Sequence, residues 1–232
     1  MTWLVTGAGR GLGRHIAMAL VARGHRVLAC GRDEERLGLL ASGTSVGRII
    51  PVPLDLSDAA QVIPRVREAI ASVARIDGVV NNAGFGFHKP FVEHTERELA
   101  DMVQVNFTAA MQVCLAVLPR LMEQRSGHIV NIGSDLGRRP LAKMAPYVAT
   151  KHALAGFSHS LLREVKESGI KVTLVNTGIV DTDFAGGREG TKEEHWSLRP
   201  AILARLIVDL VEQPGNVVVD EVSVHPLGQG DF

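Results

Sequence analysis

The stretch "TWLVTGAGRGLG", residues 2–13, decides the fold, because a short apolar run leads directly into a turn with four glycines. Residues 2–6 are predicted to form a β-strand, and a helical pattern begins at about residue 12. Between a strand and a helix, glycines let the backbone approach a pyrophosphate closely, and the helix N-terminus offers unpaired N–H groups. A tight turn without a ligand also needs glycine. The place of this turn at the head of an alternating chain favours a dinucleotide site.

In the residues that follow this turn, short runs rich in β-branched residues alternate with segments in which apolar residues recur with the period of a helix. Gly24 and Gly169 stand where helices should end, and "TERE" at 95–98 is a capping box that opens a long helix. Such alternation predicts an α/β single-domain Rossmann fold, with a doubly wound, seven-stranded parallel sheet flanked by helices. No linker or repeat divides residues 1–232. The expected strands are 2–6, 26–31, 48–54, 76–82, 127–133, 170–176 and 216–224.

Composition excludes several classes of protein. The 232 residues have a formal net charge of zero, with 46% hydrophobic and 22% charged residues, so nothing points to nucleic acid or to an anionic membrane. No secretion signal is evident, and no apolar run reaches the ~18–20 residues of a membrane span, so we expect a cytoplasmic protein. The two cysteines, Cys30 and Cys114, lie in apolar stretches and are expected to be buried free thiols. The nine histidines show no zinc-like spacing, and no metal is expected.

The end of the second strand should select the cofactor. NAD-specific sites typically place a carboxylate there, whereas this strand ends "ACGRDEE", with Gly31 at that position and Arg32 next. Arg32 and Arg10 suit the 2′-phosphate of NADP(H), which guanidinium groups bind with paired hydrogen bonds. Two alternatives stay open: Arg32 is a solvated surface charge, or Asp33 reaches the ribose and restores NAD. We expect NADP(H).

The stretch "PYVATK", residues 146–151, holds the only tyrosine of the chain. Tyr147 and Lys151 are four residues apart and share a helix face, where an ammonium can favour the phenolate form of the phenol. Hydride transfer to a carbonyl requires a proton donor at the oxygen and a second donor to stabilise its charge.

With these motifs in order, the chain resembles a short-chain dehydrogenase/reductase over nearly its whole length. The resemblance rests on "TGAGRGLG" (6–13), "DLSD" (55–58), "NNAG" (81–84), "VQVNF" (103–107), "VNIGSDLG" (130–137) and "YVATK" (147–151). One departure is Thr177, which stands where the family usually has proline and loosens a rigid turn beside the nicotinamide.

The resemblance implies the site residues. Tyr147 is the general acid/base, Ser134 holds the substrate oxygen, Lys151 binds the nicotinamide ribose and lowers the pKa of the phenol, and Asn106 supports a water. Asp55 is implied at the adenine, Asn82, Ala83 and Gly84 along the ribose, and Thr182 at the carboxamide. The full set of implied cofactor-binding residues is Gly7, Gly9, Arg10, Gly11, Leu12, Gly13, Arg32, Asp55, Leu56, Asn82, Ala83, Gly84, Tyr147, Lys151, Gly178, Val180 and Thr182.

The expected activity is therefore that of an NADP-dependent carbonyl or 3-oxoacyl reductase, or of an alcohol dehydrogenase. The substrate, a small carbonyl or alcohol, is not identified by the sequence. Two alternatives are a catalytically silent dinucleotide-binding regulatory protein and an epimerase or dehydratase. Substrate walls are expected from Phe85, Phe87, His88, residues 135–144 and a mobile, Gly-rich loop at 183–197. The resemblance also implies a homodimer or homotetramer, paired through helices at about 95–122 and 147–168, with residues 224–232 at a second interface.

Overall fold

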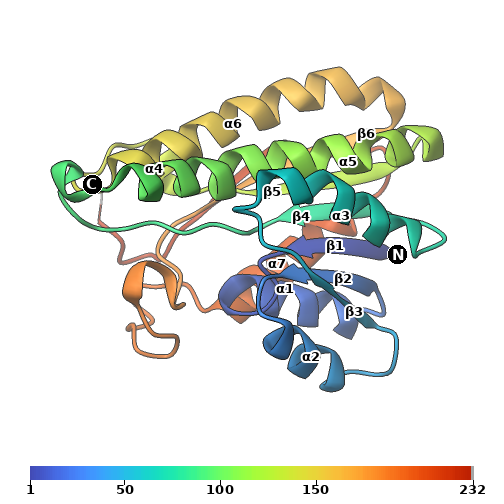
Figure 1. The fold of residues 1–232 in the computed structure, drawn as a ribbon, viewed down its shortest axis with the longest axis horizontal. Coiled ribbons are helices and arrows are strands. Elements are labelled where there is room, and N and C mark those ends of the chain that lie inside the picture. The colour runs from blue at the N-terminus through green and yellow to red at the C-terminus, as the bar shows by residue number, and fades with distance from the viewer. Residues whose placement is uncertain (231–232) are drawn as a thin grey trace.

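A computed structural model describes residues 1–230, and these form one seven-stranded sheet in which every strand pair is parallel. The strand order, β3-β2-β1-β4-β5-β6-β7, confirms the predicted doubly wound topology. Figure 1 shows helices on both sides of the sheet. The strands are β1 (Thr2–Thr6), β2 (Arg26–Gly31), β3 (Ile49–Pro53), β4 (Gly78–Asn81), β5 (Gly127–Ile132), β6 (Ile170–Thr177) and β7 (Glu221–Val224).

One face of the sheet is covered by α1 (Gly11–Ala22), α2 (Glu34–Ser42) and α7 (Pro200–Val211), and the other by α3 (Ala59–Ala71), α4 (Glu96–Val103), α5 (Ala109–Gln124) and α6 (Ala145–Val165) (Figure 1). Each layer has its own apolar core. The central strands are buried on both faces and are rich in Val, Ile and Leu, with buried polar residues such as Asn81 and Asn131 among them. The shorter helical turns are Phe91–Glu93, Gln104–Thr108, Asp135–Gly137, Lys166–Ser168 and Phe184–Gly186.

The predicted helix signals are present. Thr95 and Glu98 form the capping box at the start of α4, with both reciprocal hydrogen bonds. Gly24 and Gly169 follow helical segments with φ of +83° and +77°, a backbone conformation that favours glycine.

Two expectations need correction. The last strand runs over Glu221–Val224 and not from residue 216, because residues 216–220 lie outside the register with β6, in which pairing begins with Leu174 opposite Glu221. Secondly, the helical run Glu96–Gln124 has a mean hydropathy of 1.5 and is long enough to cross a membrane by composition. In the fold, 44% of its most apolar 18-residue window is buried, by packing on α3 and the sheet, while Val103, Leu115 and Met122 are exposed.

The two halves of the sheet wind in opposite directions from β1 and β4, so a crevice opens between the carboxyl ends of these strands. The glycine turn follows β1, "NNAG" begins at the end of β4, and Ser134 follows β5. The strand order thus brings the three predicted motifs to one edge of the sheet.

Candidate active site

The glycine turn after β1 has the geometry of an anion-binding loop. Gly7 and Gly11 have φ of +68° and +49°, and a side-chain carbon at Gly13 would lie 2.3 Å from the Gly7 carbonyl oxygen. Helix α1 begins at Gly11 without a side-chain cap and without an acidic residue in its first turn. Its first N–H groups therefore face the crevice unpaired by a side-chain cap, and the positive end of the helix dipole points at the same place.

Thr6 ties this turn to the end of β4. Its hydroxyl accepts hydrogen bonds from the N–H groups of Asn82 and Ala83, at 3.0 and 3.1 Å, and its carbonyl accepts from the Asn82 amide at 3.0 Å. The segment Asn82–Gly84 is thereby held directly beside Gly7. These contacts join residues 76 positions apart, and they fix the width of the crevice.

Asp33, just after the end of β2, is the N-cap of helix α2. Its carboxylate accepts from the Arg36 N–H at 3.0 Å, as an N-cap, and forms an ion pair with the Arg36 side chain. Arg10 and Arg32 are exposed beside it, and Gly31 leaves the space next to Gly9 open. The exposed Arg10 and Arg32 provide positive charge near this strand end, whereas Asp33, the first carboxylate after it, is paired with Arg36.

Asp55 and Leu56 follow β3 on the same edge. The Asp55 carboxylate is exposed and accepts from the N–H and the hydroxyl of Ser57, at 2.9 and 2.8 Å. The Leu56 carbonyl accepts from Gln104 at 2.9 Å, which links this loop to the turn that carries Asn106.

Asn106 lies in a π-helical turn, Gln104–Thr108, which interrupts the long helix between α4 and α5. The wider turn directs the buried Asn106 amide at the Phe85 backbone. Asn106 Oδ1 accepts a hydrogen bond from the Phe85 N–H at 2.9 Å, and Asn106 Nδ2 donates to the Phe85 carbonyl at 2.8 Å. Its Nδ2 also reaches the Thr150 hydroxyl at 3.3 Å, and this hydroxyl in turn donates to the Tyr147 carbonyl. The amide thus joins the β4 loop to α6.

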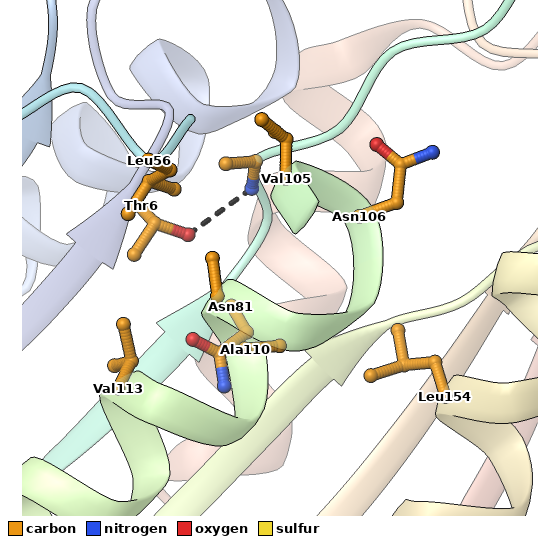
Figure 2. Close-up of a pocket in the computed structure, with 10 residues that line it drawn as sticks. Thr6, Leu56, Asn81, Val105, Asn106, Ala110, Val113 and Leu154 are labelled. Atoms are coloured by element: carbon orange, nitrogen blue, oxygen red, sulfur yellow. Dashed lines mark hydrogen bonds between the residues drawn. The ribbon is translucent and has the colours of Figure 1, made fainter. Parts of the chain in front are cut away.

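Figure 2 shows a small pocket beneath this turn. Thr6 of β1 and Asn81 of β4 line it from the sheet, Asn106 from the π turn and Leu154 from α6. The Asn81 amide donates to Asn131 at 2.9 Å, and Asn131 donates to Ser158 at 2.8 Å, so a buried polar chain runs under the site from β4 to α6.

Helix α6 presents Tyr147 and Lys151 on one face, as their spacing predicts. Lys151 Nζ lies 5.6 Å from the centroid of the Tyr147 ring and donates to the Ile132 carbonyl at 2.8 Å. The Ser134 hydroxyl lies close enough to the Tyr147 phenol to act on its pKa, and it accepts the Leu136 N–H at 3.1 Å. All three side chains are at most 7% exposed. Gly84 lies beside these side chains, because a Cβ added at Gly84 would be 3.8 Å from Lys151 Nζ.

Burial controls the ionisation of this pair. It raises the pKa of Tyr147 to about 12, although the hydrogen bond with Ser134 acts in the opposite direction. It lowers the pKa of Lys151 to about 8. In the protein without cofactor, burial thus sets the direction of both shifts, and the expectation that Lys151 together with a bound nicotinamide lowers the pKa of the phenol stays a prediction.

Apolar residues surround the phenol. The Phe184 ring lies 5.2 Å from the Tyr147 ring, centroid to centroid, and Gly86 fits between the two rings. Tyr147 also belongs to a cluster with Met102, Leu136 and Met144, against which Phe85 and Phe87 pack. Four of the residues or segments expected to form the substrate walls thus lie around the Tyr147 ring or pack on its cluster: Phe85, Phe87, residues 135–144 and the loop 183–197. His88 is exposed and lies outside this cluster.

The segment after β6 reaches back to the glycine turn. Thr182 is buried, and its side chain lies 3.5 Å from the position of an added Cβ on Gly11. Val180 pairs with Leu198 in an isolated bridge, whereas Gly178 packs against residues of the C-terminal segment. Thr177 ends β6 and is buried, with its backbone inside the sheet register, so the strand continues without the usual proline.

Asp181, which sequence reasoning missed, fixes the loop 183–197. Its buried carboxylate accepts the N–H groups of Gly190 and Lys192, at 3.0 and 3.3 Å, and pairs with Arg199. An acidic residue in the short segment between the predicted strand 170–176 and the Gly-rich loop is the available signal. In residues 1–230, no group of three His, Cys, Asp or Glu side chains is placed to hold a metal ion.

The sequence pattern of the short chain dehydrogenase family matches residues 1–193. The chain belongs to this family. This short-chain dehydrogenase is 31% identical to an uncharacterized oxidoreductase of Staphylococcus aureus over 224 residues, which cover 97% of the chain and 96% of the relative.

Two solved structures place the same fold beside nicotinamide cofactors. An alcohol dehydrogenase from the archaeon Thermococcus sibiricus, complexed with 5-hydroxy-NADP, superposes with a TM-score of 0.92 at 27% identity, covering 100% of this chain and 98% of that one. The closed form of a serine dehydrogenase complexed with NADP+ superposes with a TM-score of 0.91 at 29% identity, covering 100% and 97%. The family and the Rossmann-like fold expected from the motifs are therefore confirmed.

Proposed function

We propose that this short-chain dehydrogenase is an NADP(H)-dependent oxidoreductase that interconverts a carbonyl and an alcohol by hydride transfer, with Tyr147 as the general acid/base. The observation that carries the proposal is the buried set at the carboxyl edge of the sheet. The Ser134 hydroxyl lies close enough to the Tyr147 phenol to act on its pKa, Lys151 Nζ lies 5.6 Å from the centroid of the phenol ring, and Asn106 braces the same helix through Thr150. A purely structural role gives no reason to bury an ammonium beside a phenol, because such burial is costly.

The glycine turn, Asn82–Gly84 and Thr182 would hold the cofactor. The glycine positions leave room for backbone approach, and the uncapped N-terminus of α1 suits a pyrophosphate. Leu12 lies partly buried in the first turn of that helix. NADP(H), when bound, supplies or accepts the hydride.

The proton is moved by residues of the chain. In reduction, Tyr147 donates its proton to the carbonyl oxygen as negative charge develops there, and Ser134 provides the second hydrogen bond. Because burial raises the pKa of the phenol to about 12, Tyr147 carries its proton throughout the neutral range. Alcohol oxidation requires the phenolate, which the positive charge of Lys151 and of an oxidised nicotinamide would favour. At neutral pH the free protein is thus prepared for reduction.

The preference for NADP(H) over NAD(H) rests on the end of β2. Asp33 caps α2 and pairs with Arg36, so a ribose hydroxyl would compete with these contacts for its carboxylate. Arg10, which follows Gly9, and Arg32, which follows Gly31, are both exposed and would pair with a 2′-phosphate. Two solved relatives in complex with NADP+ or an NADP analogue support this preference.

We further propose a cytoplasmic homo-oligomer that acts on a small molecule. The long helices α4 and α5 expose Val103, Leu115 and Met122, which suit a helix pair between two copies. Of the C-terminal stretch 224–232, Gly228 and Gln229 bond with loops of their own chain, Leu227 is fully exposed, and residues 231 and 232 lie outside the described residues. Light scattering after size-exclusion chromatography gives the mass directly.

The test is to titrate the wild type, Arg32→Ala and Tyr147→Phe with NADPH and with NADH, and to measure binding by fluorescence or calorimetry. We expect NADPH to bind at least about ten times more tightly to the wild type, since a charged pair contributes about 1.5–3 kcal/mol. Arg32→Ala should abolish the preference, and Tyr147→Phe should bind normally. If neither nucleotide binds, the enzyme proposal fails. NADPH binding without oxidation by any carbonyl would instead favour a dinucleotide-binding regulatory protein.

A further inference from the structure

The C-terminal segment after β7 folds back onto the active-site edge of the sheet. Pro226 is buried, and the Gly228 N–H donates to the His195 carbonyl at 3.1 Å. Gly228 also packs so closely on the His195 ring that an added Cβ would lie 2.3 Å from it. The chain end therefore reaches the loop 183–197 and the two strands that flank the candidate site.

Gln229 uses both ends of its amide to join two turns of this edge. Its Oε1 accepts the Ile179 N–H at 2.8 Å, and its Nε2 donates to Asp135 Oδ2 at 2.9 Å. Gly178 makes the approach possible, because an added Cβ there would lie 2.3 Å from Gln229 Oε1. A neutral side chain with one acceptor and one donor is required at this point, and glutamine supplies it.

The two turns carry opposite sides of the site. Asp135 directly follows Ser134 and begins the short helical turn whose Leu136 N–H bonds with the Ser134 hydroxyl. Ile179 begins the segment that continues through Val180 to Thr182, which lies against Gly11 of the cofactor turn. The Gln229 amide therefore connects the turn that begins at Ser134, close to the Tyr147 phenol, to the segment that faces the proposed cofactor site.

We propose that Gln229 is a positioning residue for the reaction, acting through Asp135 on Ser134 and through Ile179 on the segment that ends at Thr182. The inference rests on the proposed carbonyl reduction. Gln229 itself does not contact Tyr147, Ser134 or Lys151, so its effect falls on the alignment of the reacting groups. The adenosine end of the proposed cofactor site lies at β2 and α1, away from this contact.

His225 and Arg138 are charged or titratable residues near the contact between Gln229 and Asp135. His225 Nδ1 lies 3.8 Å from Asp135 Oδ2, with the His225 side chain about half exposed. Arg138, three residues after Asp135, directs its guanidinium at Glu221 and Ser223 instead. Replacing Gln229 with glutamate removes the donor and places a second carboxylate against Asp135. The double variant D135N/Q229E inverts the bond, because the amide introduced at position 135 can donate to the new carboxylate while Ile179 keeps its acceptor.

The experiment compares wild type, Q229E, D135N, D135N/Q229E and the control Q213E. Gln213 lies beyond the end of α7, where its amide donates to the Asp209 carbonyl, so its charge change is remote from the site. Two readouts are taken well below the melting temperature. One is kcat and KM for NADPH-dependent reduction of a panel of an aliphatic ketone, an aromatic aldehyde, an acetoacetyl thioester and a steroid ketone. The other is amide hydrogen exchange in peptides covering 132–139 and 177–183.

We expect Q229E to lower kcat about tenfold, the loss that follows from one hydrogen bond to a charged group. The Kd for NADPH should stay within about threefold, and exchange should accelerate in both peptides. The double variant should recover most of both effects, as coupled residues do, and Q213E should match the wild type.

Unchanged kcat and exchange in Q229E would overturn the proposal, as would a double variant no better than the product of its single variants. A lower melting temperature with normal kcat would also overturn it, because that is the result of a merely structural contact. If the wild type reduces no carbonyl, the proposed function fails. The exchange data then decide by themselves whether Gln229 couples the two turns.

Discussion

Replacing Gly86 with alanine tests how closely the reacting phenol is enclosed. The added carbon would lie 3.0 Å from Tyr147 Cδ2 and 3.1 Å from Phe184 Cζ. Carbon atoms in contact prefer about 3.5–4.0 Å, so each ring has to move by roughly 0.5 Å, or the backbone after β4 has to shift. Gly86 is buried, so the methyl group cannot turn into solvent.

Two magnitudes follow from this displacement. Overpacking of a buried position costs about 1–3 kcal/mol, and we expect about 1 kcal/mol because the Phe184 loop can yield more easily than α6. A displacement of about 1 Å at a reacting group costs about 10²-fold in rate, so roughly half of that should lower kcat by about tenfold. The Kd for NADPH should change little.

The assays are urea unfolding and NADPH absorbance with the best carbonyl of the panel. Gly156→Ala is the matched control, because Gly156 is exposed on α6 with nothing within 4 Å of an added Cβ. Its methyl group should stabilise the helix by about 0.5–1 kcal/mol and leave kcat unchanged. In a Phe184→Ala background, Gly86→Ala should be milder, since the Tyr147 ring can tilt into the space of the missing ring.

A result in which Gly86→Ala behaves like Gly156→Ala in both assays would refute the enclosed geometry. Equal effects of Gly86→Ala with and without Phe184 would show that the clash falls on Tyr147 or the backbone alone, and would refute the role given to Phe184.

Three further predictions address the proton donor, the buried cation and the loop. Tyr147→Phe should lower kcat by about 10²–10⁴-fold, the usual contribution of a general acid, with the Kd for NADPH within about threefold; turnover above a tenth of the wild-type rate would contradict the assignment. Lys151→Met should abolish turnover without loss of stability at pH 7. Burial lowers the pKa of Lys151 to about 8, so between pH 8 and 10 the unfolded chain binds more protons than the folded one. Over this range the free energy of unfolding of the wild type, measured in urea, should therefore rise by up to about 2 kcal/mol more than that of the variant. A parallel gain in both proteins would exclude Lys151 as its source. Asp181→Asn should accelerate protease cleavage within 183–197, because the carboxylate holds the N–H groups of Gly190 and Lys192; the wild type should be further protected by NADPH, and equal cleavage of the two proteins would show that the loop is held elsewhere.

The sequence by itself determined the elements and their type. Strand and helix periods, the capping box at Thr95 and the glycine helix ends are local signals, formed within one or two turns of chain, and the structure reproduces them. The spacing of Tyr147 and Lys151 acts over a single helical turn, so their shared face was also predictable. The start of β7 was mispredicted because it does not depend on a local signal. The run from residue 216 has strand character by itself, but the register with β6 decides which of its residues pair.

Only the tertiary structure decided how these pieces meet. The reversal of strand order between β1 and β4 places the Thr6 hydroxyl on Asn82, and a π turn aims Asn106 at Phe85 and α6. Nothing in the local pattern encodes a contact such as Gln229 with Asp135, which joins residues 94 positions apart. The ionisation of Tyr147 belongs to the same class. A neighbouring lysine is visible in the sequence, but the removal of water that raises the pKa of the phenol arises only when the sheet, the β4 loop and α6 close around it.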